Sequence, residues 1–233
     1  RLRGVAEAVP LNRLLLETDA PWLAPEPHRR GRNEPAYVKL VAEKIAEIRG
    51  MTVEDLTRAT TGNSMRLFGF PVPGSPSIAY EMSGNLYLNI TNRCTNRCCF
   101  CIREQTDTLW GYNLRLREEP TAQDVLDAIG DPTRYDEIVF CGYGEPTLRL
   151  DLVKEVGRRL RDAGARVRID TNGQGSLIWN RNIAPELAEV ADAVSVSLNA
   201  QDAETYGRLC GSRFGEDAYG HVIAFIRECV KTW

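Results

Sequence analysis

The stretch NLYLNITNRCTNRCCFC, residues 85–101, joins a strand-like segment to four closely spaced cysteines. Residues 85–91 are typical of a β-strand, and the cysteines lie in the loop that follows it. Cys94, Cys98 and Cys101 have the spacing C-x3-C-x2-C, and Cys99 is the extra one. Thiolates this close in sequence can surround one metal centre. The stretch therefore predicts a strand followed by a loop whose cysteines bind a metal centre.

Downstream of this loop, strand-like and helical segments alternate. Alternation with strands of this length is typical of parallel βαβ units, so we predict an α/β fold. The predicted strands are 85–91, 136–142, 165–173 and 193–200; the predicted helices are 121–130, 150–164, one around 184–191 and one from about Ala218.

Each predicted strand is followed by an unusual polar segment. The cysteine loop follows the first, and GYGEP (142–146), DTNG (170–173) and SLNA (197–200) follow the others. Parallel α/β barrels carry their active sites at the carboxyl ends of their strands. We therefore expect these four segments to meet at one site.

Three kinds of chemistry fit the cysteine loop by itself. A structural zinc site would use Cys94, Cys98 and Cys101 with Cys99 or a distant cysteine, because structural zinc takes four ligands. A redox dithiol would use Cys98 and Cys101 and leave the third cysteine unexplained. Three ligands with one open position would suit a cluster or metal that also binds substrate.

With its companions, the loop resembles that of the radical S-adenosylmethionine (radical SAM) superfamily. The resemblance lies in C-x3-C-x2-C with Phe100 before the last cysteine, and in Gly-Tyr-Gly-Glu-Pro about forty residues later. It implies a partial (βα) barrel in which Cys94, Cys98 and Cys101 hold a 4Fe–4S cluster and SAM chelates the fourth iron. An electron donor such as flavodoxin or ferredoxin is implied. SAM would be cleaved to methionine and a 5′-deoxyadenosyl radical, which abstracts hydrogen from an unknown small-molecule or protein substrate.

The resemblance also implies a SAM site. The expected SAM-binding residues of GYGEP are Gly142, Tyr143, Gly144 and Glu145. The two glycines would let the backbone approach the methionine end of SAM, and Glu145 and nearby backbone groups would accept from its ammonium group. DTNG resembles the glycyl-radical-enzyme activases of the superfamily, which implies a cation site. The expected contacts there are Asp170 and Thr171 with the cation, and Asn172, Ser197 and Asn199 with the SAM carboxylate or ribose. The alternative for each residue is an ordinary turn that satisfies loop backbone.

Residues 1–70 resemble a different family. LLLETDAPWLAP, PHRRGRNEPAYV and TTGNSMRLFG are similar to the C-terminal end of TatD-type metal-dependent deoxyribonucleases, which are TIM barrels. The resemblance implies a last barrel strand, two C-terminal helices, and Asp19 as one ligand of a divalent metal. One carboxylate cannot hold a catalytic metal pair, so we expect nuclease activity and DNA binding only from a complete TatD domain.

The two parts together resemble the TatD-associated radical SAM proteins. We predict a TatD-like fragment at 1–70, a linker at 71–77 (PVPGSPS) and a radical SAM core at 78–233. The missing initiator Met and the four predicted strands suggest a piece of a longer protein, since the family core has six. The alternatives are a metal-dependent DNase seen only in part, and a non-catalytic zinc-binding module.

Composition limits the remaining possibilities. The chain has 233 residues, 43% of them apolar, and a net charge of −3. This charge gives no indication of nucleic-acid binding, and the apolar runs are too short for a membrane span. Clustered cysteines in place of a disulfide framework fit a reducing compartment, so we expect a cytoplasmic protein.

Overall fold

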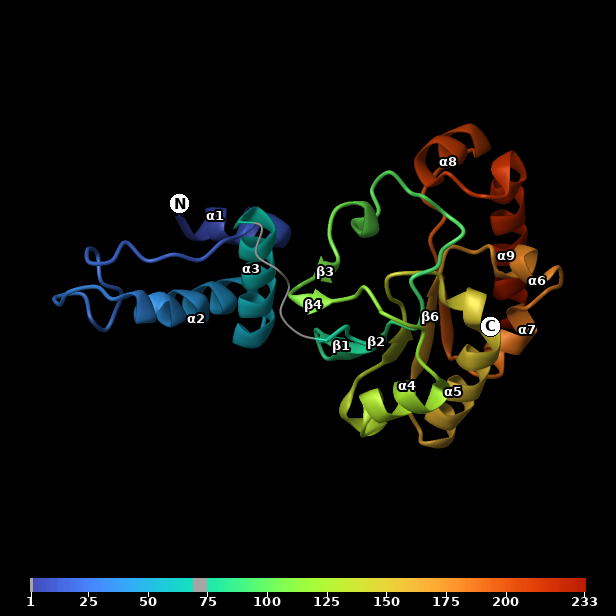
Figure 1. Ribbon diagram of the computed structural model, residues 1–233, viewed down its shortest axis with the longest axis horizontal. Coiled ribbons are helices and arrows are strands. Elements are labelled where there is room, and N and C mark those ends of the chain that lie inside the picture. Colours follow the sequence, from blue (N-terminus) through green and yellow to red (C-terminus); the bar gives the residue numbers. More distant parts are fainter. Residues whose placement is uncertain (1, 69–74) are drawn as a thin grey trace. The chain divides into compact units, whose positions relative to one another are not determined.

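The computed structural model describes residues 2–68 and 75–233, which divide into two compact units (Figure 1). One unit contains Arg1–Ser75 with Thr108–Asn113, and the other contains Pro76–Asp107 with Leu114–Trp233. Most of the predicted linker, residues 71–74, lies outside the described residues.

The second unit is built on a five-stranded sheet. The strand order is β1-β2-β5-β6-β7, in which β2, β5, β6 and β7 are parallel and β1 pairs antiparallel with β2. The four predicted parallel strands are thereby confirmed, and β1 is an addition to them. The bounds are β1 (Ala79–Met82), β2 (Asn85–Leu88), β5 (Ile138–Phe140), β6 (Val167–Thr171) and β7 (Ala193–Val196).

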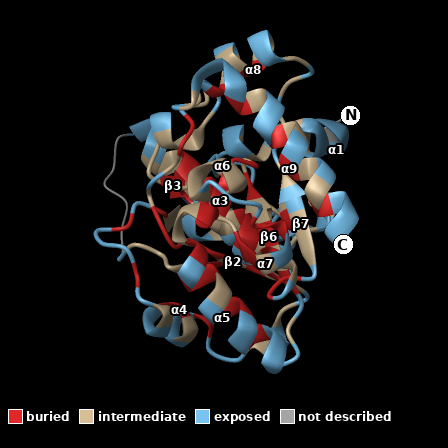
Figure 2. Ribbon diagram, turned by 90° about the vertical axis from the view of Figure 1, so that its right-hand side faces the viewer, coloured by how far each residue is buried: buried red, intermediate tan, exposed pale blue. Residues whose placement is uncertain are grey.

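Helices pack on one face of this sheet and bury its apolar side chains (Figures 1 and 2). Ile138, Phe140 and Ile169 alternate with residues that face the other way, and all three are fully buried. The covering helices are α4 (Ala122–Ile129), α5 (Leu150–Asp162), α7 (Ala184–Ala188) and α9 (Ala218–Thr232). The shorter helices are α6 (Gly175–Trp179) and α8 (Ala203–Cys210).

The opposite face of the sheet carries several polar side chains. Tyr87, Arg168 and Asp170 are half-buried there, and Arg168 forms ion pairs with Asp170 (3.0 Å) and Glu137 (2.8 Å). Because β2, β5, β6 and β7 run parallel, the loops that follow them leave the same edge of the sheet. The four polar segments therefore gather at this edge, as predicted.

The first unit is helical. Its helices are α1 (Leu2–Ala8), α2 (Val38–Arg49) and α3 (Val53–Phe68), and it includes the hairpin of β3 (Thr108–Leu109) and β4 (Tyr112–Asn113). Helix α2 ends at Gly50 in the left-handed conformation (φ 62°). The Thr52 hydroxyl then accepts from Asp55 N (3.1 Å) and so caps the start of α3.

The predicted last strand of the TatD-like segment is extended chain instead. Leu14 has β-region angles (φ −84°, ψ 130°), but no described segment pairs with residues 14–19 in a ladder. Asn63 Nδ2 donates to the Leu11 and Leu14 carbonyls, both at 2.8 Å. The apolar pattern of residues 14–19 indicates extended chain, and the structure agrees, but a β-strand also requires a second strand to pair with.

Short 3-10 turns connect several elements: η1 (Leu11–Arg13), η2 (Pro35–Tyr37), η3 (Ile102–Glu104), η4 (Pro132–Arg134), η5 (Pro146–Arg149) and η6 (Gly215–Asp217). Within the described ranges, no helix has both the length and the apolar character needed to cross a membrane.

Candidate functional site

The loop after β2 presents three half-buried thiols. Cys94, Cys98 and Cys101 are all free, and Cys99 is exposed. The Cys101 amide donates to the Cys98 carbonyl (3.0 Å), which closes a turn between the last two predicted ligands. Cys94 Sγ accepts from the Asn96 amide at 3.4 Å. Three of the four thiols of the loop are thus partly shielded from solvent, and the fourth is not.

Burial changes the acidity of these thiols. Burial raises the pKa of Cys94, and it raises the pKa of Cys98 to about 12, with a further contribution from the neighbouring Cys210. Both thiols are therefore protonated at neutral pH in the metal-free chain. A metal that binds them has to displace these protons, so its affinity will increase with pH.

The donor set fits an iron–sulfur cluster. Among residues 2–68 and 75–233, no group of three His, Cys, Asp or Glu side chains is arranged around a single ion. A cubic 4Fe–4S cluster makes a different demand, because each cysteine binds a different iron. The Cys94 and Cys101 thiols are close enough to Cys98 to add to the increase in its pKa, so the three thiols lie in one neighbourhood.

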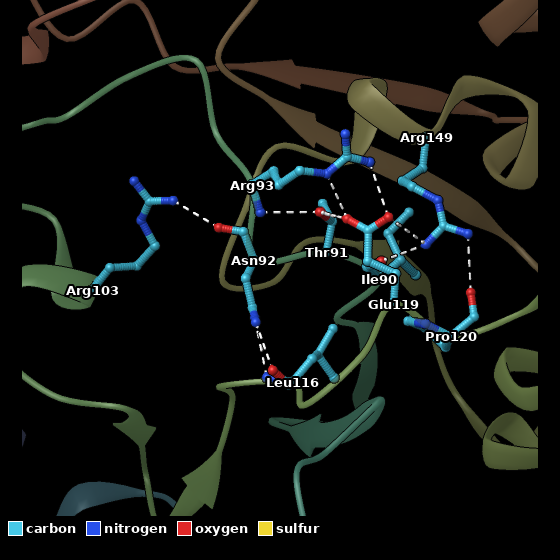
Figure 3. Close-up of polar contacts among 9 residues, drawn as sticks. All are labelled: Ile90, Thr91, Asn92, Arg93, Arg103, Leu116, Glu119, Pro120 and Arg149. Atoms are coloured by element: carbon cyan, nitrogen blue, oxygen red, sulfur yellow. Dashed lines mark hydrogen bonds and ion pairs between the residues drawn. The ribbon is translucent and has the colours of Figure 1, made fainter.

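Glu119 anchors the start of the cysteine loop (Figure 3). Its carboxylate accepts from the Thr91 hydroxyl (2.5 Å) and from Arg93 Nε and Nη2 (2.7 and 2.9 Å). Arg149 lies 3.5 Å away and also donates to the Ile90 carbonyl (3.0 Å). The bonds from Arg93 lower the pKa of Glu119, so the anchor stays ionised at neutral pH.

Asn92 fixes the loop on its other side (Figure 3). Its side chain donates to the Leu116 carbonyl (2.7 Å) and accepts from the Leu116 amide (3.0 Å), as a strand neighbour would. Arg103 donates to the carbonyls of Asn92 (2.9 Å) and Asn96 (3.1 Å) and so spans the loop. These contacts hold the backbone before Cys94 and between Cys94 and Cys98.

Gly142 and Gly144 allow a close approach to the cysteine loop. A Cβ on Gly144 would overlap the Arg93 carbonyl oxygen and lie 2.6 Å from that of Thr91. A Cβ on Gly142 would overlap the Asn89 side-chain oxygen. The GYGEP segment therefore packs directly on the backbone that precedes Cys94, which only glycine permits.

Tyr143, between these glycines, is nearly buried. Its hydroxyl donates to Asp107 Oδ1 (2.7 Å) and approaches the Thr106 carbonyl (3.0 Å). Its amide donates to Asn89 Oδ1 (2.8 Å). Tyr143 thereby connects GYGEP to the segment that follows the cysteine loop.

Glu145 connects GYGEP to the DTNG segment. It is 3% exposed, and its carboxylate accepts from the Thr147 amide and hydroxyl (3.1 and 2.5 Å). It also accepts from the Thr171 hydroxyl and the Asn172 amide, both at 2.7 Å. Burial raises the pKa of Glu145, and these bonds oppose the increase. The side chain predicted to bind the SAM ammonium is thus engaged by four donors of the chain itself.

We expect Glu145→Gln to lower the free energy of unfolding by about 2 kcal/mol. Glutamine has one acceptor oxygen, so its amide group must face one of the four donors that Glu145 satisfies. Urea denaturation measures the loss. Glu155→Gln on the exposed side of α5 (56% side-chain exposure) is the matched control and should change little. Equal stability of the two variants would contradict the role of Glu145.

The DTNG and SLNA residues lie at the same edge. Asn172 Nδ2 donates to Thr95 Oγ1 (2.8 Å) and approaches Cys94 Sγ (3.7 Å), so it reaches the cysteine loop directly. Asp170 is half-buried and paired with Arg168. Ser197 and Asn199 are exposed, and Asn199 Nδ2 lies 3.9 Å from Cys210 Sγ.

Three residues that hold the cysteine loop, Asn89, Asn92 and Glu119, were not predicted from the sequence. Asn89 is fully buried and also donates to the carbonyls of Ser77 and Leu114. A signal for it was present, because a polar residue between Leu88 and Ile90 interrupts an apolar run. Glu119 carries no such local signal, since its partners are distant in sequence.

Asp19, the predicted metal ligand of the first unit, is exposed and lies in a turn. The Asp19 carbonyl closes this turn by accepting from the Trp22 amide (2.7 Å).

Residues 1–69 match the TatD related DNase family. The metal-dependent hydrolase YcfH of Escherichia coli K12 is 54% identical over 68 residues, which are 29% of this chain and 26% of that protein. The 3′-5′ ssDNA/RNA exonuclease TatD of Erwinia amylovora is 42% identical over 72 residues, 29% of this chain and 28% of that protein. The chain therefore spans about a quarter of the length of these relatives.

The chain has two further similarities. A solved structure of TYW1 with a lysine-pyruvate adduct bound is similar with a TM-score of 0.41 and 17% identity, over 61% of this chain and 50% of that one. Residues 88–231, which include the cysteine loop, GYGEP, DTNG and SLNA, match the Radical SAM superfamily. Because that match covers more than half of the chain, the protein belongs to the radical SAM superfamily.

Proposed function

We propose that this radical SAM enzyme holds a 4Fe–4S cluster on Cys94, Cys98 and Cys101 and binds SAM beside it. When bound, the cluster supplies the electron for reductive cleavage of SAM, which yields methionine and a 5′-deoxyadenosyl radical that takes hydrogen from a substrate. A small flavodoxin or ferredoxin would deliver the electron. Membership of the superfamily supports this proposal.

The observation that carries the proposal is the set of contacts between the cysteine loop and the neighbouring strand ends. Asn172 donates to the residue after Cys94, and the Glu145 amide donates to the Arg93 carbonyl (2.8 Å). The thiols, GYGEP and DTNG thus form one hydrogen-bonded assembly at the carboxyl edge of the sheet. A cofactor bound to these thiols would lie within reach of all three segments.

The chain's own residues have three tasks in this proposal. The thiols give up protons and bind iron, and the surrounding anchors hold their loop in place. Backbone groups of GYGEP, brought close by Gly142 and Gly144, are proposed to orient the methionine end of SAM. Asp170, Thr171, Asn172, Ser197 and Asn199 are proposed to line the carboxylate and ribose side.

Anaerobic reconstitution with iron and sulfide tests the proposal. We expect about four irons per chain, and release of methionine and 5′-deoxyadenosine from SAM under a strong reductant. A colourless protein with one tightly bound zinc would overturn it and favour a structural zinc module. Iron binding without SAM cleavage would contradict the catalytic part alone.

For the TatD-like segment we propose no nuclease activity in this chain. Asp19 is the only predicted ligand of the divalent metal site there, and hydrolytic two-metal sites need several. Metal-dependent cleavage of DNA by the purified chain would refute this.

A further inference from the structure

The cysteine loop is joined to helix α8 through its backbone. Helix α8 ends at Cys210, and Gly211 follows in the left-handed conformation (φ 51°). The last carbonyls of a helix have no donor within the helix. Here the Cys99 amide donates to the Leu209 carbonyl and the Arg97 amide to the Cys210 carbonyl, both at 2.9 Å. The cysteine loop therefore caps α8, and α8 fixes the loop.

A buried polar cluster lies behind this contact. Gln174 Nε2 donates to Asn96 Oδ1 (2.8 Å) and to the Tyr206 hydroxyl oxygen (2.9 Å). Asn96 Nδ2 donates to the same hydroxyl (3.4 Å), and Ser212 Oγ donates to Gln174 Oε1 (3.2 Å). Gln174, Tyr206 and Asn96 are at most 3% exposed. Such a network rigidifies its members when each is satisfied.

The same elements surround one predicted iron ligand. Cys98 packs against an apolar cluster that contains Tyr206, Cys210 and Val222, from α8 and α9. Asn96 and Arg97, the loop residues held by α8, both lie between Cys94 and Cys98 in sequence. Contacts with α8 therefore help to hold the segment that separates these two thiols.

We infer that Tyr206 and Gln174 are positioning residues, which act through Asn96 to hold the segment between Cys94 and Cys98. Their polar groups reach the loop at Asn96, on the buried side of the segment. This inference deepens the proposed function, on which it rests only for the identity of the metal.

The test replaces Tyr206 with phenylalanine in the full chain, reduced and free of metal. Removal of the hydroxyl oxygen leaves the buried side-chain amides of Gln174 and Asn96 without the acceptor that they share. This loss should shift the equilibrium for local opening of the loop roughly tenfold. We expect amide hydrogen exchange at Arg97 and Cys99, and alkylation of Cys98, to become about ten times faster. Exchange in β5 and β6 should not change, which separates a local role from general destabilisation.

Tyr219→Phe is the matched control. The Tyr219 hydroxyl donates to the Gln201 carbonyl (2.7 Å), and its ring lies 5.8 Å from that of Tyr206 without a bond to the cysteine loop. Equal loop exchange in the two variants would overturn the inference. If Tyr206→Phe unfolds the whole chain, Asn96→Ala is measured in its place, and unchanged exchange at Arg97 and Cys99 would again overturn it.

The proposed iron–sulfur cluster provides a second readout. In the reconstituted protein, a chelator should remove iron about ten times faster from Tyr206→Phe than from Tyr219→Phe. Faster loop exchange in a chain that never binds an iron–sulfur cluster would support the positioning role and refute the proposed function. Failure of the positioning role and failure of the proposed function are thus distinguishable.

Discussion

Replacement of Cys94, Cys98 or Cys101 by serine is expected to abolish cluster binding and to lower SAM cleavage more than 100-fold. A serine hydroxyl is a poor ligand for iron because it does not ionise near neutral pH, whereas a thiol does so when a metal binds. Loss of a residue that only hydrogen-bonds to a metal ligand already lowers metal affinity by about 10–100-fold, and loss of the ligand itself should exceed that. Iron content and methionine release after reconstitution measure the effect.

Cys99→Ser is the control for this series. Cys99 is an exposed thiol next to Cys98 but is not a predicted ligand, so its replacement makes the same chemical change in the same loop. Its amide, which bonds to α8, is unaffected by the change of side chain. We expect full iron content and activity. Loss of the cluster from Cys99→Ser, with retention in any one of the other three variants, would show that the ligands are assigned incorrectly.

Gly144→Ala is expected to disrupt the site as strongly, by a different route. The new methyl group would collide with backbone atoms of Thr91 and Arg93, which cannot rotate away as a side chain could. Overpacking of this kind costs about 3 kcal/mol or more. Because the displaced backbone leads directly into Cys94, both the free energy of unfolding and the iron content should fall.

Gly220→Ala makes the same chemical change where there is room. Gly220 lies in α9, and a Cβ there meets nothing within 4 Å. Alanine should stabilise that helix by up to about 1 kcal/mol and leave iron binding unchanged. Equal stability and equal iron content of Gly144→Ala and Gly220→Ala would contradict the conclusion that GYGEP packs closely on the cysteine loop.

The sequence predicted the parts of this site that depend on local pattern. The strands that lead into the cysteine loop, GYGEP and DTNG were recognised from apolar residues and the polar turns after them, and the parallel sheet followed from their alternation with helices. Strand β1 was missed because it is four residues long and lies at the edge of the sheet. The hairpin of β3 and β4 was missed because its strands have two residues each.

Helix α8 was missed although its N-cap was visible. Asp202 accepts from the Thr205 amide (2.8 Å), a recognisable start, but Gly207 weakens the helical pattern and the helix has only eight residues. Its pairing with the cysteine loop could not be predicted, because a helix C-terminus accepts any donor that the fold brings to it. The role of Glu145 was also hidden, because its four donors come from two loops that meet only in the folded sheet.

The bond between Asn96 and Tyr206 spans 110 residues of sequence. On a ribosome that adds about 5–20 residues per second, the thiols emerge roughly 5–20 s before the helix that holds their loop. During this interval the nascent cysteines are exposed to oxidants and to competing soft metals. Under the proposed function, iron loading would therefore depend on timing as well as affinity, and assembly of the cofactor is expected to follow completion of the fold around α8.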